Sequence, residues 1–178
     1  MRYSGIDKTD IANGEGVGVA LFVQGCPFHC KGCFNPETWD FKGGKEFTKK
    51  TKEDFIKLIQ RPYITRITIL GGEPLCPQNV YEVYQLIKEL RQYDKTIWLY
   101  TGNVYEDLYE RGTYGDNPYD VDMLSAAMLV DVLVDGQFIE EKKNLTLKFR
   151  GSSNQRVIDM AKMRHENCLE NAIIKEGY

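Results

Sequence analysis

The sequence predicts an α/β fold: an open, partial (βα) barrel with a mostly parallel, curved sheet. Short apolar segments alternate along the chain with stretches whose apolar residues recur at helical spacing, which is typical of βαβ units. The chain has 178 residues, whereas a complete eightfold barrel takes about 250, so only part of a barrel can form. We expect one domain over residues 1–178, with its chemistry beyond the carboxyl ends of the strands.

Five apolar segments predict strands, at residues 17–23, 67–70, 96–100, 130–134 and 145–149. In the middle three the apolar residues run on without regular alternation, as expected for strands that are covered on both faces. In the last segment Leu145, Leu147 and Phe149 alternate with polar residues, which indicates a strand at an edge.

Four stretches predict helices, because their apolar residues form one stripe. Each begins near a residue that suits a helix N-terminus. The starts and their stripes are Thr51 with Phe55, Leu58 and Ile59; Pro77 with Val80, Val83, Ile87 and Leu90; Asp120 with Val121, Leu124 and Met128; and Ser153 or Asn154 with Val157, Ile158 and Ala161.

Composition and charge argue against several classes of protein. The 23 basic and 26 acidic side chains give a net charge of −3, which does not favour a nucleic-acid partner. The apolar fraction of 42% is enough to bury a core. No apolar segment approaches the ~20 residues that cross a bilayer, and no secretory signal is present. We therefore expect a cytoplasmic protein without a membrane partner.

The cysteines are the most informative residues of the sequence. There are five, and the first three lie within eight residues of each other: Cys26, Cys30, Cys33, Cys76 and Cys168. Clustered thiols in a cytosolic chain indicate a metal or redox site, and thiolates suit iron–sulfur clusters, zinc or copper(I). Three ligands leave one metal corner free, whereas structural zinc sites use four. A zinc site completed by His29 or by one of the two isolated cysteines remains an alternative.

The segment QGCPFHCKGCFN resembles the cluster loop of radical S-adenosylmethionine enzymes. The resemblance implies that Cys26, Cys30 and Cys33 hold three irons of a 4Fe-4S cluster, and that the open fourth iron binds S-adenosylmethionine. The position before the third cysteine is commonly aromatic in that superfamily, but here it is Gly32, followed after the cysteine by Phe34. Gly32, Cys33 and Phe34 are implied to border the adenosyl part of the cosubstrate.

Further segments are similar to one branch of that superfamily, the activating enzymes of anaerobic ribonucleoside-triphosphate reductase. They are CKGCFNPETW, NGEGVGVALFVQGC, ILGGEPL, VDG and RGSSNQ. The resemblance implies that Gly71, Gly72 and Glu73 hold the methionine ammonium, since carbonyls and a carboxylate accept hydrogen bonds from a cation. A plain strand-to-helix turn is the alternative for this segment.

Other candidate residues have both a structural and a functional interpretation. Asp135 follows a strand, where an acid can face a ligand, but an Asp-Gly pair also forms turns. Thr101 and Gly102 end another strand with the same ambiguity. The lysine-rich stretch 42–52 is typical of a solvated face, with a docking surface for a protein as the less favoured alternative.

The resemblance implies an activating enzyme that reductively cleaves S-adenosylmethionine. The resulting 5′-deoxyadenosyl radical would generate a glycyl radical on the large subunit of anaerobic (class III) ribonucleoside-triphosphate reductase. A flavodoxin- or ferredoxin-type protein is the implied electron donor. Two other functions stay open: activation of another glycyl-radical enzyme such as pyruvate formate-lyase, and a non-enzymatic zinc or iron–sulfur module.

Overall fold

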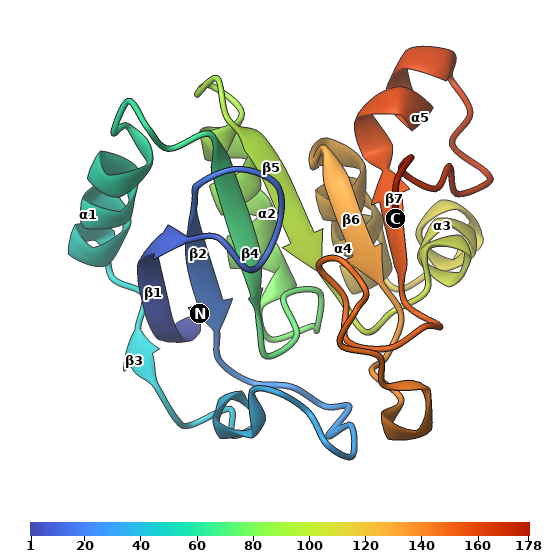
Figure 1. Cartoon of the computed structure of the whole chain (residues 1–178), viewed down its shortest axis with the longest axis horizontal. Helices are drawn as coiled ribbons and strands as arrows, with labels where there is room; N and C mark the ends of the chain where they lie inside the picture. The colour runs from blue at the N-terminus through green and yellow to red at the C-terminus, as the bar shows by residue number, and fades with distance from the viewer.

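The computed structural model describes residues 1–178 and contains one seven-stranded sheet, in the order β3-β1-β2-β4-β5-β6-β7 (Figure 1). The strands are β1 (Arg2–Asp10), β2 (Gly18–Val23), β3 (Lys45–Glu46), β4 (Arg66–Gly71), β5 (Thr96–Tyr100), β6 (Val132–Asp135) and β7 (Arg156–Asp159). Neighbours among β2, β4, β5 and β6 are parallel. β1, β3 and β7 pair antiparallel at the two edges. The α/β class and the open sheet are confirmed, but the sheet is mixed and its barrel character is not confirmed.

Four of the helices lie between strands along the chain, and the fifth follows the last strand. They are α1 (Lys49–Ile59), α2 (Val80–Leu90), α3 (Tyr105–Tyr114), α4 (Pro118–Leu129) and α5 (Met160–Glu166), with short 3-10 helices η1 (Pro36–Thr38) and η2 (Glu140–Lys142). In Figure 1, α2 and α4 lie behind the sheet, so its near face carries no helix. None of the helices has the length and apolar character needed to cross a membrane.

The two faces of the sheet bury different side chains. On β5, Ile97 and Leu99 belong to the larger core beneath the helices, whereas Trp98 points to the helix-free face. Trp98 packs there with Val132, Val134 and Val157, in the alternation that a strand imposes. Each fully buried apolar side chain contributes roughly 1.5–3 kcal/mol, so both faces stabilise the sheet.

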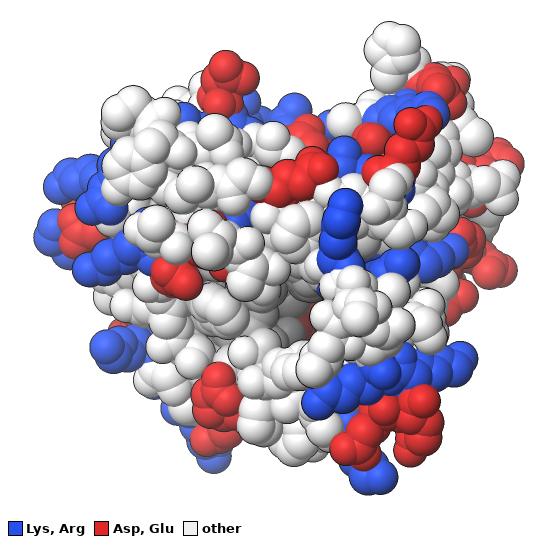
Figure 2. Space-filling view, in the orientation of Figure 1, with Lys and Arg blue, Asp and Glu red and all other residues white.

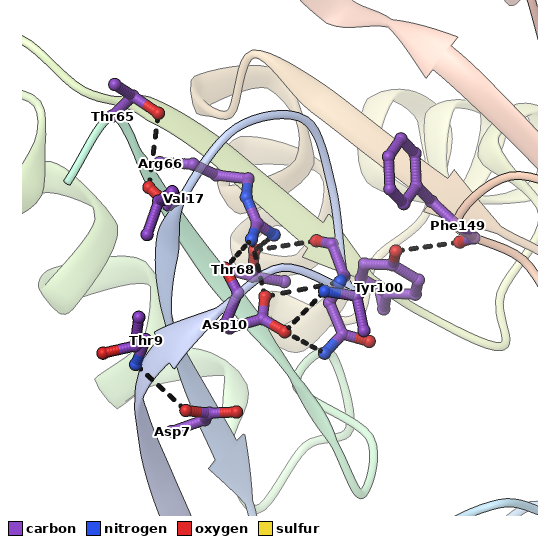
Figure 3. A network of polar contacts seen from close by, with 11 residues as sticks. Asp7, Thr9, Asp10, Val17, Thr65, Arg66, Thr68, Tyr100 and Phe149 are labelled. Carbon is purple, nitrogen blue, oxygen red and sulfur yellow. Dashed lines mark hydrogen bonds and ion pairs between the residues drawn. The ribbon is translucent and has the colours of Figure 1, made fainter. Parts of the chain in front are cut away.

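The helix-free face also holds a buried ion pair, which Figure 3 shows. Arg66 is fully buried, and its Nη2 donates to Asp10 Oδ2 at 2.6 Å and to the Asp10 carbonyl at 2.8 Å. Its Nη1 donates to Thr68 Oγ1 at 2.7 Å. A Cβ at Gly14 would lie 2.6 Å from the Arg66 side chain. The glycine-rich segment after β1 is therefore shaped to cover this arginine.

Four of the five predicted strands are present, but the segment 145–149 is not a strand. Thr146 N–H donates to Asn144 Oδ1, which makes a turn, and Phe149 has a positive φ of 57°. Leu145 is 77% exposed. The alternation of apolar and polar residues was not sufficient here, because no neighbouring strand pairs with this segment.

The final helix begins later than predicted. Val157 and Ile158 lie in β7, which pairs with β6. α5 begins at Met160, where the Asp159 side chain accepts the Lys162 N–H at 2.8 Å. The prediction that Ser153 or Asn154 caps this helix was therefore wrong. Val157 and Ile158 are both β-branched and apolar, so they suit a strand as well as a helical stripe.

The other predicted helices exist with shifted starts. α1 is capped by Thr48, whose Oγ1 accepts from Thr51 N–H, and α2 begins after Asn79, beyond Pro77. α4 is capped by Asn117, and its buried face differs from the predicted stripe because Val121 is exposed. The sequence patterns did not indicate β1, β3, α3 or the two 3-10 helices, and they indicated a helix where β7 lies.

Candidate functional site

The loop after β2 and the turn after β4 meet at the carboxyl edge of the sheet, as the sequence predicted. Gly72 N–H donates to the Val23 carbonyl at 2.9 Å, and Glu73 N–H donates to the Gly25 carbonyl at 2.8 Å. This edge lies at the bottom of Figure 1, and Figure 2 shows a hollow in the same face near the ends of the central strands. The cysteine-bearing loop and the Gly-Gly-Glu turn thus form one continuous region.

The two glycines of the turn are required by this close approach. A Cβ at Gly72 would lie 2.4 Å from the Gly25 carbonyl oxygen, and one at Gly71 would lie 2.8 Å from Phe22 Cα. Gly71 also has a φ of +107°, which side-chain-bearing residues rarely adopt. The packing of the turn on the β2 loop therefore explains both glycines, whatever ligand the turn contacts.

Glu73 is buried at the centre of the edge, where its carboxylate joins two strand ends. It accepts hydrogen bonds from Leu75 N–H at 2.8 Å, Thr101 Oγ1 at 2.7 Å and Gly102 N–H at 2.8 Å. Burial raises the pKa of Glu73 from its ordinary 4.5 to about 7, although the hydrogen bonds act in the opposite direction. Thr101 and Gly102, which were ambiguous in the sequence, serve here as its partners.

The three clustered cysteines share the loop after β2, and all of them are free thiols. Cys26 is buried, while Cys30 and Cys33 are partly exposed, and Cys33 N–H donates to the Cys30 carbonyl at 3.1 Å. Burial raises the pKa of the Cys26 and Cys30 thiols. No three His, Cys, Asp or Glu side chains are gathered around one point that could hold a metal ion.

The residues proposed as a fourth ligand in the zinc alternative lie in different surroundings. His29 stacks on Trp39, with ring centroids 4.8 Å apart and planes at 22°. Cys76 is buried, and burial raises its thiol pKa to about 12. Cys168 is exposed in the segment after α5. None of the three forms a metal-binding group with the clustered cysteines.

Gly32 and Phe34 lie against residues 138–143, for which the sequence pattern indicated no role. Gly32 has a φ of +74°, and a Cβ there would lie 2.9 Å from Glu140 Oε1. Phe34 is 54% exposed and meets Phe138 edge-to-face, with centroids 5.2 Å apart. Lys143 Nζ lies 5.2 Å from the centre of the Phe34 ring. The VDG and RGSSNQ motifs flank this segment in the sequence, with glycines at 136 and 151.

Asp135 is fully engaged by other protein groups. It is buried, and its carboxylate accepts from Tyr105 N–H at 2.8 Å and from Arg156 Nε at 3.0 Å. Arg156 also pairs with Glu106, with Nη1 3.0 Å from Oε1. Asp135 therefore links β6 to α3 and β7 in this structure. Neither alternative from the sequence, a ligand-facing acid or an Asp turn, includes this role.

Comparisons with known proteins agree with the class that the fold and the thiols suggest. A family model described as a 4Fe-4S single cluster domain matches residues 12–158. The chain thus belongs to a class of proteins that bind one 4Fe-4S cluster. Several relatives of this chain are named "Anaerobic ribonucleoside-triphosphate reductase-activating protein".

The relative from Enterobacteria phage T4 is 38% identical over 161 residues, which is 88% of this chain and 93% of the relative. The relative from Escherichia coli K12 is 37% identical over 164 residues, 87% of this chain and 96% of the relative. The relative from Vibrio cholerae is 35% identical over 159 residues, with the same shares. The chain belongs to the family of anaerobic ribonucleoside-triphosphate reductase-activating proteins.

Proposed function

We propose that this chain generates a glycyl radical on the large subunit of anaerobic ribonucleoside-triphosphate reductase by reductive cleavage of S-adenosylmethionine. The observation that carries the proposal is the meeting of the cysteine loop with the Gly-Gly-Glu turn, where Glu73 N–H donates to the Gly25 carbonyl at 2.8 Å. The names of the relatives support the choice of partner. A flavodoxin- or ferredoxin-type electron donor stays a prediction from the resemblance.

The donor set of the loop fits a 4Fe-4S cluster that is bound by Cys26, Cys30 and Cys33. Three free thiols offer the soft ligands that iron–sulfur clusters take. In this structure the three side chains are not gathered around one point. A bound cluster would supply one electron, received from the external donor, and S-adenosylmethionine would accept it, so that a sulfonium C–S bond would break into methionine and a 5′-deoxyadenosyl radical.

The turn after β4 has the groups needed to hold the cosubstrate's ammonium. The backbone of Gly71 and Gly72 supplies carbonyl oxygens. Glu73 supplies negative charge next to them in the chain when the pH is above its pKa of about 7. Because Glu73 already accepts three hydrogen bonds, its contribution is mainly electrostatic. We do not include Asp135 among the residues that contact S-adenosylmethionine, because its carboxylate oxygens already accept hydrogen bonds from Arg156 and the Tyr105 N–H.

The loop side of the site would border the adenosyl group. Phe34 is 54% exposed, so one part of its ring is available to an aromatic base, and aromatic pairs contribute about 0.5–1.5 kcal/mol beyond buried area. Gly32 and Cys33 precede it in the same loop. No helix covers the face of the sheet next to this edge (Figure 1), and we propose that a peptide segment of the reductase approaches from that side.

A cleavage assay with two protein substrates tests the proposed function. The chain is loaded with iron and sulfide without oxygen, reduced, and incubated with S-adenosylmethionine and either the reductase or pyruvate formate-lyase. We expect 5′-deoxyadenosine as product and a glycine-centred radical on the reductase only. A radical on the lyase alone would assign the chain to the other activase class, and a chain without cleavage would favour a metal-binding module.

A further inference from the structure

One side chain, Gln155, joins both ends of the segment that lies against the cysteine loop. Its Oε1 accepts from Gly151 N–H at 2.9 Å and from Ser152 N–H at 3.1 Å, at the end of the segment. Its Nε2 donates to the Gly136 carbonyl at 3.0 Å, at the beginning. We call residues 137–150 the bridging loop. Gln155 thus closes the base of the bridging loop, as in compact loops whose ends lie close together.

Hydrogen bonds hold most of the bridging loop, and Phe149 near its end packs on Trp98 with ring centroids 5.4 Å apart. No residue from 137 to 150 is fully buried, and segments with few buried contacts open locally at low cost. Asn154 also reaches the base of the loop, but its Nδ2 contacts only the Gln137 carbonyl, at 2.8 Å. Gln155 is the side chain that bonds to both flanking glycines. Its loss removes this side-chain link between the two ends, while backbone bonds such as that from Ser153 N–H to the Lys142 carbonyl at 2.9 Å remain.

The bridging loop contacts three residues of the cysteine loop in turn. Glu140 Oε2 lies 2.8 Å from Lys31 Nζ, and Glu140 also occupies the space beside Gly32. Phe138 packs edge-to-face on Phe34. A Cβ at Gly151 would lie 2.6 Å from Phe34 Cε2, so the base of the loop touches the same aromatic ring. The position of Phe34 thus depends on how the bridging loop is closed.

We propose that Gln155 is a positioning residue that, by closing the bridging loop, holds Phe34 in place and so sets the affinity of the site for S-adenosylmethionine. The proposal rests on the proposed function, because Phe34 is one of the residues that would border the adenosyl group. Gln155 itself contacts neither the cysteines nor the Gly-Gly-Glu turn in the structure; its partners are Gly136, Gly151, Ser152 and Arg150. It therefore acts through Phe34.

The test compares Gln155→Ala with a matched control, Gln92→Ala, whose exposed side chain bonds only to the Glu89 carbonyl. Equilibrium binding of S-adenosylmethionine is measured on the cluster-loaded chains. We expect Gln155→Ala to bind about tenfold more weakly, which corresponds to about 1.4 kcal/mol, with the same iron content per chain. Gln92→Ala should bind as the original chain does. Equal affinity in Gln155→Ala and the original chain would overturn the proposal.

A second measurement needs neither cluster nor cosubstrate. Trypsin cuts after lysine, and Lys142, Lys143 and Lys148 are exposed in the bridging loop. In the cluster-free chain we expect faster cleavage at these sites in Gln155→Ala than in Gln92→Ala. Unchanged cleavage would show that Gln155 does not close the loop. Faster cleavage with unchanged affinity would show that the loop does not shape the site, and would also overturn the proposal.

Gly151→Ala provides a second variant that leaves the Gln155 side chain intact. The added Cβ would press on Phe34 and Phe138, so the affinity for S-adenosylmethionine should fall. This effect on Phe34 does not depend on opening of the bridging loop, so it does not need faster cleavage by trypsin. An unchanged affinity in this variant would contradict the dependence on Phe34. If the original chain itself binds no S-adenosylmethionine, the proposed function fails, and that result is distinct from a failure of the role of Gln155.

Discussion

Thr101 Oγ1 donates to Glu73 Oε1 at 2.7 Å, and this bond ties the end of β5 to the turn after β4. Gly102 N–H completes the link at 2.8 Å from Glu73 Oε2. A carboxylate that joins two neighbouring strand ends fixes the shape of the edge at which the cysteine loop arrives. The same carboxylate is buried, so its charge is costly and its protonation is coupled to folding.

The first prediction concerns the pH dependence of stability. The folded state raises the pKa of Glu73 from 4.5 to about 7, so between these values the folded chain binds more protons than the unfolded chain. The contribution of Glu73 to the free energy of unfolding should therefore fall as the pH rises from about 4.5 to about 7. Denaturant titration of the cluster-free chain measures it. In Glu73→Gln this part of the pH dependence should disappear; a slope identical to that of the original chain would contradict the raised pKa.

The second prediction concerns the close approach of Gly72 to the cysteine loop. Gly72→Ala places a Cβ 2.4 Å from the Gly25 carbonyl oxygen, and such overpacking costs about 1–3 kcal/mol. Both the free energy of unfolding and the affinity for S-adenosylmethionine should decrease. Gly5→Ala is the control, because a Cβ at Gly5 meets nothing within 4 Å. Equal stability of the two variants would mean that the turn and the loop can separate without cost.

The sequence predicted the central part of the fold because burial on both faces leaves a simple apolar pattern. β4, β5 and β6 follow this pattern, and their order places the loops at one edge. β1 was missed because its sequence, RYSGIDKTD, is mostly polar and half exposed at an edge. The segment 145–149 has the alternation of a strand but lacks a partner, a property that depends on the distant chain.

The candidate site was predictable only where it depended on a local pattern. The spacing of Cys26, Cys30 and Cys33 placed them in one loop, and the loop meets the Gly-Gly-Glu turn as expected. The partners of Asp135 could not be predicted, because Arg156 comes from the edge strand β7 and the N–H of Tyr105 from the start of α3. The roles of the proposed ligand residues remain predictions.

The third prediction concerns the ion pair on the helix-free face. Arg66→Ala leaves the buried carboxylate of Asp10 without its cation, and breaking a buried pair in this way costs about 3–5 kcal/mol. Thermal and denaturant unfolding measure the loss. Arg61→Ala, which removes a hydrogen bond only to the Tyr63 hydroxyl, should change stability by less than about 0.5 kcal/mol. Similar losses in both variants would argue against a special role for the buried pair.

The fourth prediction concerns the ligands of the cluster. Cys30→Ala should prevent stable assembly of a 4Fe-4S cluster and abolish cleavage of S-adenosylmethionine, because only two clustered thiols would remain. Cys168→Ala is the matched control, since this cysteine is exposed after α5, and it should retain the cluster. Iron and sulfide per chain are measured after anaerobic loading. A Cys30→Ala chain with full cluster content and turnover would remove Cys30 from the ligand set.

The central claim is that three cysteines leave one iron of the cluster free for S-adenosylmethionine. Electron paramagnetic resonance of the reduced, cluster-loaded chain tests it most directly, with spectra taken before and after addition of S-adenosylmethionine. We predict an iron–sulfur signal that changes when the cosubstrate is added. A colourless protein that holds one zinc ion per chain and accepts no iron–sulfur cluster, or a cluster signal that S-adenosylmethionine leaves unaltered, would contradict the account.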